Sequence, residues 1–143
     1  MSAITEVEPN VFAAGQPTAD QIARLAQMGF VRVIDLRPAA EDHGSDEPAI
    51  LAAAGMEYLS LPIAAEADLA SAAVNQLDQW LGDASIGKTL IHCASGNRVG
   101  ALLALRAAWH QNFGTEQALQ LGRVAGLKSL EPAVCRLLQE GRS

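Results

Sequence analysis

The residues from Ile91 to Arg98 constrain the fold more than any other part of the chain. They follow a strand-like run, Lys88-Thr89-Leu90-Ile91, and they precede a helix-like run from Val99 to Gln111. The tip of a strand therefore meets the start of a helix across a short loop of small and polar residues, and Cys93 stands at the beginning of that loop.

Strand-like and helix-like runs alternate along the rest of the chain. We predict strands over residues 31–36 and 57–61 and up to 91, and helices over 47–54, 69–81, 99–111, 115–124 and 131–140. Residues 4–13 are predicted to form a hairpin or irregular edge, and Thr18 to begin an amphipathic helix that Gly29 ends. This order predicts an α/β fold, a mostly parallel central sheet flanked by helices.

The carboxyl ends of the predicted parallel strands mark the place where a ligand would bind. In open α/β sheets ligands bind outside these ends, so the segments that begin at Arg37, Pro62 and Cys93 should converge on one pocket. We expect residues 1–143 to form a single domain, because this length suits one hydrophobic core.

Charge and residue usage exclude several classes of partner. The net charge of -6 argues against a nucleic acid or an anionic membrane as partner. The first residues lack the pattern of a signal peptide, and no apolar run is long enough to span a bilayer, so we expect a reduced cytoplasmic protein. The two cysteines make no disulfide framework and the three histidines are scattered, so we expect neither a metal nor a cofactor. No sequence feature bears on the oligomeric state.

The loop around Cys93 has the residues of an anion-binding nucleophile site. Backbone amides of residues 94–97 and the start of the following helix should point at one spot, where the helix dipole favours negative charge. The same field should favour the thiolate of Cys93 and make it a nucleophile. Arg98 falls in the first helical turn, where the dipole disfavours a cation unless an anion compensates, so we expect it to bind the ligand.

The neighbours of Cys93 in this loop have structural and ligand-binding alternatives. Ala94, Ser95, Gly96 and Asn97 are the expected substrate-binding residues, with Gly96 allowing a positive backbone angle or a close approach to the anion. Ser95 and Asn97 either donate to the anion or only close the turn. His92 is expected to orient the loop rather than carry protons, and it could also favour the thiolate.

Three further groups lie outside this loop. Arg37 is expected to pair with Asp35 or another acid, with substrate binding as the alternative. The acidic pairs at residues 41–42 and 46–47 are predicted to be solvated and to repel polyanions. Cys135 is predicted to lie in the core, with a role as a resolving cysteine as the alternative. Trp80, Trp109 and Phe113 are predicted to be packing residues.

Four motifs in order resemble one known family. They are Gly15-Gln16-Pro17, FVRVIDLRP at 30–38, YLSLPI at 58–63 and HCASGNRVGA at 92–101. Together they resemble the phosphatase-like domain of the beta-lactamase-hydrolase-like family, which is related to dual-specificity phosphatases, over roughly residues 10–125. The resemblance implies a fold of the dual-specificity phosphatase type and a small anionic substrate.

The resemblance also implies roles for individual residues. In the phosphatases that this chain resembles, the cysteine attacks phosphorus and the arginine binds two phosphoryl oxygens. An aspartic acid from a neighbouring loop protonates the leaving oxygen. These roles fall on Cys93, on Arg98 and on Asp68, with Glu66 as the alternative acid.

Three departures from the phosphatase pattern keep other functions open. Four residues separate Cys93 from Arg98, the spacing of rhodanese sulfurtransferases, where phosphatases have five. Val99 stands where those phosphatases have Ser or Thr, and the loop after Pro62 offers no obvious acid. We therefore carry three hypotheses: a cysteine-dependent phosphatase-like hydrolase, a sulfurtransferase with a Cys93 persulfide, and a non-catalytic anion-binding module.

Overall fold

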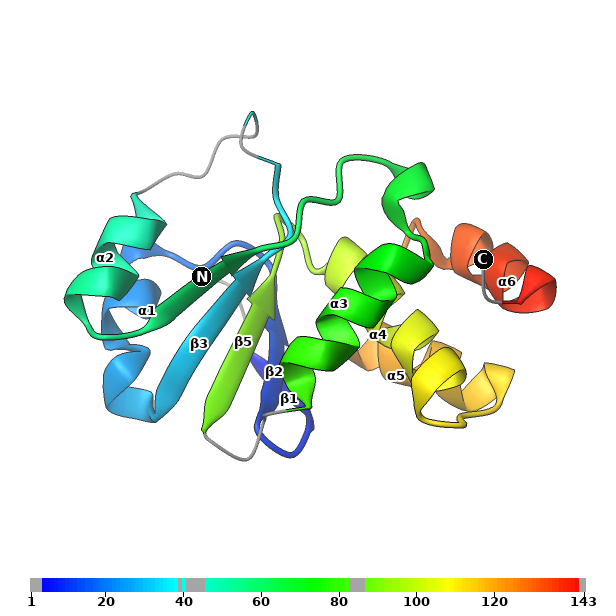
Figure 1. The fold of residues 1–143 in the computed structure, drawn as a ribbon, viewed down its shortest axis with the longest axis horizontal. Coiled ribbons are helices and arrows are strands. Elements are labelled where there is room, and N and C mark those ends of the chain that lie inside the picture. Colours follow the sequence, from blue (N-terminus) through cyan, green and yellow to red (C-terminus); the bar gives the residue numbers. More distant parts are fainter. Residues whose placement is uncertain (1–3, 39, 41–45, 83–86, 142–143) are drawn as a thin grey trace.

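Five strands form one central sheet in the computed structural model, which describes residues 4–38, 40, 46–82 and 87–141. The strands are β1 (Thr5–Glu8), β2 (Val11–Ala14), β3 (Phe30–Asp35), β4 (Glu57–Ser60) and β5 (Lys88–His92). Their order across the sheet is β1-β2-β5-β3-β4 (Figure 1). Only the β1–β2 pair is antiparallel among the described strands, so the predicted mostly parallel sheet is confirmed.

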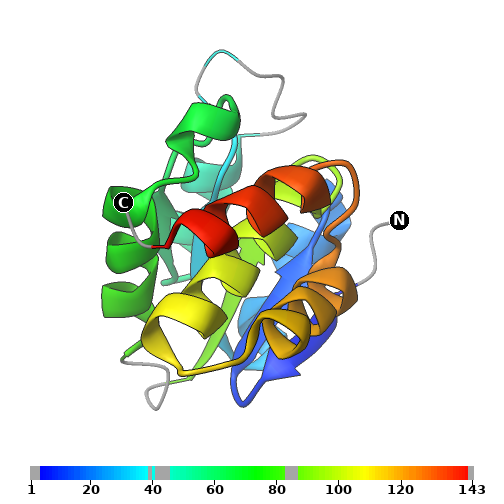
Figure 2. The ribbon, with the colours of Figure 1, turned by 90° about the vertical axis from the view of Figure 1, so that its right-hand side faces the viewer.

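Helices cover both faces of this sheet, as Figures 1 and 2 show. One face carries α1 (Ala19–Arg24) and α2 (Glu47–Ala53). The other carries α3 (Ser71–Leu81), α4 (Asn97–His110), α5 (Thr115–Ala125) and α6 (Glu131–Glu140). Two short 3-10 helices lie at Ala26–Met28 and Glu66–Asp68. None of the helices within the described ranges has the length and hydropathy needed to cross a membrane.

Successive residues of the central strands belong to two hydrophobic clusters, one on each face of the sheet. Val33 and Leu90 belong to the smaller cluster, with Ile22 of α1 and Leu51 of α2. The next residues along each strand, Ile34 and Ile91, belong to the larger cluster on the opposite face. Side chains of a strand point to alternate faces, and these strands are apolar on both, as expected for a parallel sheet covered on both sides.

The N-terminal segment follows the sequence expectations closely. Asn10, in the turn of the predicted hairpin, has a φ of 65°, a left-handed conformation that asparagine tolerates. Thr18 caps α1: its Oγ1 accepts from the amide of Gln21 at 3.1 Å, and Gln21 Oε1 accepts from the amide of Thr18 at 2.9 Å.

The prediction that Phe113 is a packing residue was wrong, because its side chain is 38% exposed beyond the end of α4.

Glycines let α4 lie against the backbone of α5 and of the segment that follows it. A Cβ at Gly100 would come within 2.3 Å of the Leu127 amide nitrogen and within 2.5 Å of the Gly122 oxygen. A Cβ at Gly126 would come within 2.8 Å of the Gly96 oxygen. The loop that carries Cys93 is therefore packed from behind by the α5–α6 connection, with no room for a side chain between them.

Candidate active site

Cys93 lies between the end of β5 and the start of α4, as the sequence predicts. Its side chain is fully buried, and the Gly96 amide donates a hydrogen bond to its Sγ at 3.1 Å. Gly96 has a φ of 92°, the left-handed conformation that glycine adopts without strain, so its predicted backbone role is confirmed. Because α4 begins at the next residue, the sulfur lies beside a helix N-terminus, where negative charge is favoured.

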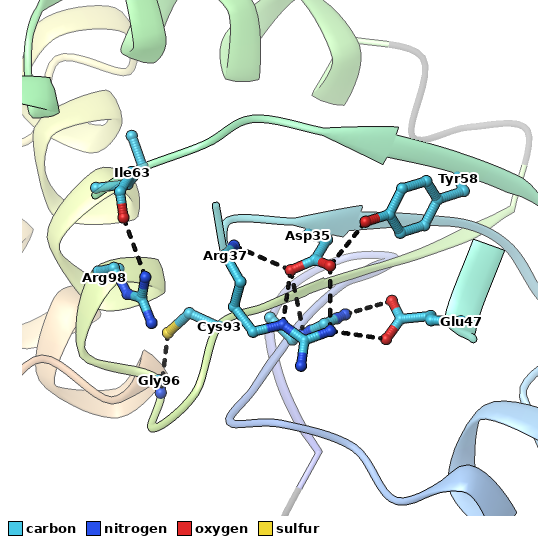
Figure 3. Close-up of polar contacts among 9 residues, drawn as sticks. Asp35, Arg37, Glu47, Tyr58, Ile63, Cys93, Gly96 and Arg98 are labelled. Carbon is cyan, nitrogen blue, oxygen red and sulfur yellow. Dashed lines mark hydrogen bonds and ion pairs between the residues drawn. The ribbon is translucent and has the colours of Figure 1, made fainter. Parts of the chain in front are cut away.

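Arg98 lies in the first turn of α4, with its side chain beside Cys93. Its Nη1 donates to the carbonyl oxygen of Ile63 at 3.0 Å, which ties it to the loop after β4. In Figure 3 the guanidinium of Arg98 and the thiol of Cys93 point toward the same space. Arg98 also lines a cavity of about 200 Å³, together with Asn97, Leu130 and residues 63–66. The cavity thus brings together the segments that follow Pro62 and Cys93, two of the three segments expected to converge.

The two candidate acids lie on different sides of the loop after β4. Asp68 Oδ2 accepts from the amides of Ala64 at 2.9 Å and Ala65 at 3.2 Å, and Asp68 lines a separate hollow beside Pro62. Glu66 lines the cavity of Arg98 and forms an ion pair with Arg136 of α6. The structure therefore brings Glu66, but not Asp68, to the wall of this cavity.

Asn97 holds the α5–α6 connection. Its Oδ1 accepts from the amides of Lys128 at 2.8 Å and Leu130 at 3.2 Å, and its Nδ2 donates to Ser129 Oγ at 2.8 Å. Of the two alternatives for Asn97, these contacts support the structural one. Elsewhere in the loop, Ala94 and Ser95 are exposed, and the Ala94 carbonyl accepts from the Gln16 amide at 2.9 Å.

Arg37 is buried under this loop rather than exposed to a substrate. Its Nε and Nη2 donate to Asp35 Oδ1 at 3.0 Å and Oδ2 at 3.1 Å, and its Nη2 also donates to Glu47 Oε1 at 3.1 Å. The predicted pairing with Asp35 is confirmed. Arg37 is 1% exposed and does not line the cavity of Arg98, so these contacts support the pairing and leave the alternative role in substrate binding a prediction.

Glu47, His92 and Tyr58 complete this buried network. His92 Nε2 lies 2.6 Å from Glu47 Oε2. The Tyr58 hydroxyl donates to Asp35 Oδ2 at 2.8 Å, as Figure 3 shows. The prediction that Glu47 is solvated was wrong: it is 1% exposed, because Arg37 and His92 bind its two oxygens. Residues 41 and 42, the other acidic pair, lie outside the described residues. Sequence reasoning also missed Tyr58, whose position in a half-buried strand carries no signal for this contact.

The network sets the ionisation of its members. Burial alone would raise the pKa of Asp35, but hydrogen bonds from Arg37, the charge of His92 and the Tyr58 hydroxyl together lower it below its ordinary value. Burial would lower the pKa of Arg37, and Asp35 and Glu47 raise it instead. Burial and the bond to Asp35 raise the pKa of Tyr58. Asp35 and Arg37 therefore carry full charges at neutral pH and Tyr58 is a neutral donor.

Three of these groups have the residue types of a metal site. Ligand atoms of Asp35, Glu47 and His92 lie within 4.8 Å of one another. The Arg37 guanidinium already donates to both carboxylates and supplies the positive charge that such ligands require. We therefore assign these residues to an ionic network and not to a metal centre.

A parallel sheet, a cysteine at the end of its central strand and an arginine on the next helix define a phosphatase-like α/β domain. The chain belongs to the family described as beta-lactamase hydrolase-like protein, phosphatase-like domain, whose model matches residues 4–110. A beta-lactamase hydrolase-like protein of Xylella fastidiosa (strain Temecula1) is 29% identical over 131 residues, which are 86% of this chain and 29% of the relative. The chain spans less than a third of the length of the curated relatives it matches.

Solved structures of phosphatase-like proteins share the fold. The DUF442 protein of Shewanella putrefaciens CN-32 has a TM-score of 0.72 and 21% identity, covering 99% of this chain and 94% of its own. A TpbA variant of P. aeruginosa, solved in complex with pTyr, has a TM-score of 0.69 and 19% identity, covering 99% and 90%. These comparisons confirm the fold of the cysteine-phosphatase type.

Proposed function

We propose that this domain is a cysteine-dependent phosphatase-type hydrolase acting on a small anionic phosphate ester. The observation that carries the proposal is the contact between the Gly96 amide and Cys93 Sγ at the N-terminus of α4, beside Arg98. The thiolate forms an S–P bond, the ester oxygen leaves and takes a proton, and water then hydrolyses the phosphocysteine. Arg98 and the loop amides stabilise the charge on the phosphoryl oxygens.

The partner that fits this site is a small molecule or a phosphorylated side chain. The relative TpbA is solved with pTyr, and the cavity beside Arg98 here measures about 200 Å³. The net charge of -6 disfavours nucleic acids and anionic membranes as partners. A nucleophilic thiol needs reducing conditions, so the proposal includes a cytoplasmic location.

The direct test is hydrolysis of an aryl phosphate by the reduced protein, with vanadate as inhibitor. We expect turnover that vanadate abolishes and that Cys135→Ser retains, because Cys135 lies on α6 and does not line the cavity of Arg98. Protein that is folded and has a free Cys93 thiol, yet hydrolyses neither aryl phosphates nor phosphotyrosine, would overturn the proposal.

Sulfur transfer is a second candidate, favoured by the four residues between Cys93 and Arg98 and by Val99 after the arginine. In this reaction the thiolate attacks the outer sulfur of thiosulfate, an S–S bond forms and sulfite leaves with the electron pair of the broken bond. The resulting persulfide passes its outer sulfur to cyanide or to a thiol. Intact mass after brief exposure to thiosulfate decides: a gain of one sulfur on Cys93 would replace the phosphatase proposal. Turnover of either kind would exclude a non-catalytic anion-binding module.

The position of Glu66 makes it the better acid of the two candidates. Glu66 can turn from Arg136 into the cavity of Arg98, whereas Asp68 is held by two loop amides on the other side. We expect Glu66→Gln to lower kcat/KM for an alkyl phosphate at least about 10²-fold, and much less for an ester with a good leaving group, which needs no proton. Steady-state kinetics on the two esters measure this difference.

The matched control is Asp68→Asn, in the same loop. It should leave the dependence on the leaving group unchanged, because the carboxyl of Asp68 does not line the cavity. If Asp68→Asn instead removes activity on the alkyl ester alone, the acid is Asp68 and the assignment to Glu66 is wrong.

A further inference from the structure

A second hollow adjoins the cavity of Arg98 and shares one wall with it. The side chain of Glu66 lines both of them. The hollow measures about 320 Å³, and its other lining residues within the described chain are one cation, Arg136, and an apolar set. The apolar residues are Ala67, Leu69, Ala70 and Leu137. Arg136 therefore supplies a positive charge to a surface that is otherwise apolar apart from Glu66.

Helix α6 extends from the cavity to this hollow. Leu130, the residue that precedes α6, lines the cavity of Arg98, and Arg136 lines the hollow. Figure 2 shows α6 beside the loop after β4, which carries Glu66. Six residues along an α-helix rise about 9 Å, a distance that a substituted aromatic ring can bridge. A molecule whose phosphoryl group is held at Arg98 can therefore reach Arg136 with its far end.

The ion pair between Arg136 and Glu66 is one that a ligand can exchange. The two side chains are 54% and 49% exposed. Exposed ion pairs contribute little to stability, because water solvates both charges well when they separate. A carboxylate on a ligand can thus replace that of Glu66 at little cost, and it offers the guanidinium the same charge-assisted hydrogen bonds.

We propose that Arg136 is a specificity-determining residue that binds a second anionic group of the substrate, and that the substrate is a small phosphate monoester with a carboxylate on an apolar body. The apolar lining of the hollow accommodates that body, and Arg136 pairs with the carboxylate in place of Glu66. Glu66 is then free to turn toward the cavity of Arg98. This inference rests on the proposed function, because it requires the phosphoryl group to bind at Arg98.

Two phosphonates of the same shape test the subsite without turnover. The probes are 4-carboxyphenylphosphonate and 4-carbamoylphenylphosphonate, which differ by one negative charge and have no ester bond to hydrolyse. The net charge of -6 disfavours the more anionic probe, so a preference for it requires a local cation. We expect titration calorimetry to show about fivefold tighter binding of the carboxylate probe, the upper range for an exposed ion pair.

Substitutions at the ion pair should change this preference in opposite directions. Arg136→Met removes the cation and should abolish or invert the preference, whereas Arg136→Lys keeps the charge and should retain most of it. Glu66→Gln removes the carboxylate that competes for Arg136, so it should increase the preference about twofold.

Arg123→Met is the matched control. Arg123 is an arginine of α5 that pairs with Glu131 of α6, and it lines neither the cavity nor the hollow. Its loss changes the net charge by the same amount and should leave the preference unchanged. Equal binding of the two probes to the wild type, binding of neither, or the same change of preference in Arg136→Met and Arg123→Met would overturn the inference.

Hydrolysis of aryl phosphates is measured separately from these affinities. Its absence would contradict the proposed function, whereas a preference that depends on Arg136 would still support the subsite. Hydrolysis together with equal affinity for the two probes would overturn the subsite alone.

Discussion

Serine in place of Cys93 should lower aryl phosphate turnover at least about 10³-fold, the largest effect on activity that we expect from one atom. The sulfur lies 3.1 Å from the Gly96 amide at the N-terminus of α4, where negative charge is favoured. A serine hydroxyl occupies the same position but stays neutral at pH 7, so it cannot form the covalent intermediate. Initial rates of the purified variant measure the loss.

The Cys93→Ser variant should remain folded and bind anions. Serine is slightly smaller than cysteine, and phosphate should still be held by Arg98 and the loop amides, as titration calorimetry can check. The control is Cys135→Ser, which should keep its activity within about twofold, since it changes a partly buried cysteine of α6. Activity that survives Cys93→Ser would mean that another group attacks the substrate.

Methionine in place of Arg37 should lower the free energy of unfolding by about 3–5 kcal/mol, the cost of breaking a buried ion pair from one side. Methionine keeps an unbranched chain in place of the aliphatic part of arginine but leaves the carboxylates of Asp35 and Glu47 without the Arg37 cation. Urea unfolding measures the difference. The control is Arg136→Met, which breaks an exposed pair with Glu66 and should cost less than about 1 kcal/mol.

The same variant should reverse the acid dependence of stability. In the wild type the pKa of Asp35 is lowered, so the unfolded chain binds more protons and stability falls as the pH drops below about 3.9. Without Arg37, burial would raise the pKa of Asp35, and the folded variant would instead lose stability as the pH rises above that value. Unfolding curves at several pH values distinguish the two slopes. Equal slopes in both proteins would contradict the account of this network.

The sequence predicts the strand, cysteine loop and helix because local pattern determines them. The apolar run to Ile91 and the small residues after Cys93 locate the turn to within two residues of the observed start of α4. The pairing of Arg37 with Asp35 is also predictable, since the two are near neighbours after one strand. These features depend on contacts between residues close in the chain.

Glu47 and Asn97 make contacts that the local sequence pattern does not predict. An acid followed by proline resembles a solvated helix start, and only the tertiary contacts of Glu47 with Arg37 and His92 show that it is buried. Asn97 binds backbone amides 31 and 33 residues further along the chain. Asp68 fits a catalytic acid by position, yet the path of the loop after β4 decides which carboxylate faces Arg98. Each outcome is set by tertiary contacts that no local pattern encodes.

The packing of Gly126 against Gly96 makes the site depend on two separate stretches of the chain. The family model matches residues 4–110 and so includes every proposed reacting group. The support of the Cys93 loop and one wall of its cavity come from residues 126–130, beyond that match. Substitution of Leu130, which lines the cavity and is not one of the proposed reacting groups, is therefore expected to change which molecules enter the cavity more than it changes the proposed reaction. Residues beyond the family match thus contribute both to the shape of the cavity and to the support of the loop.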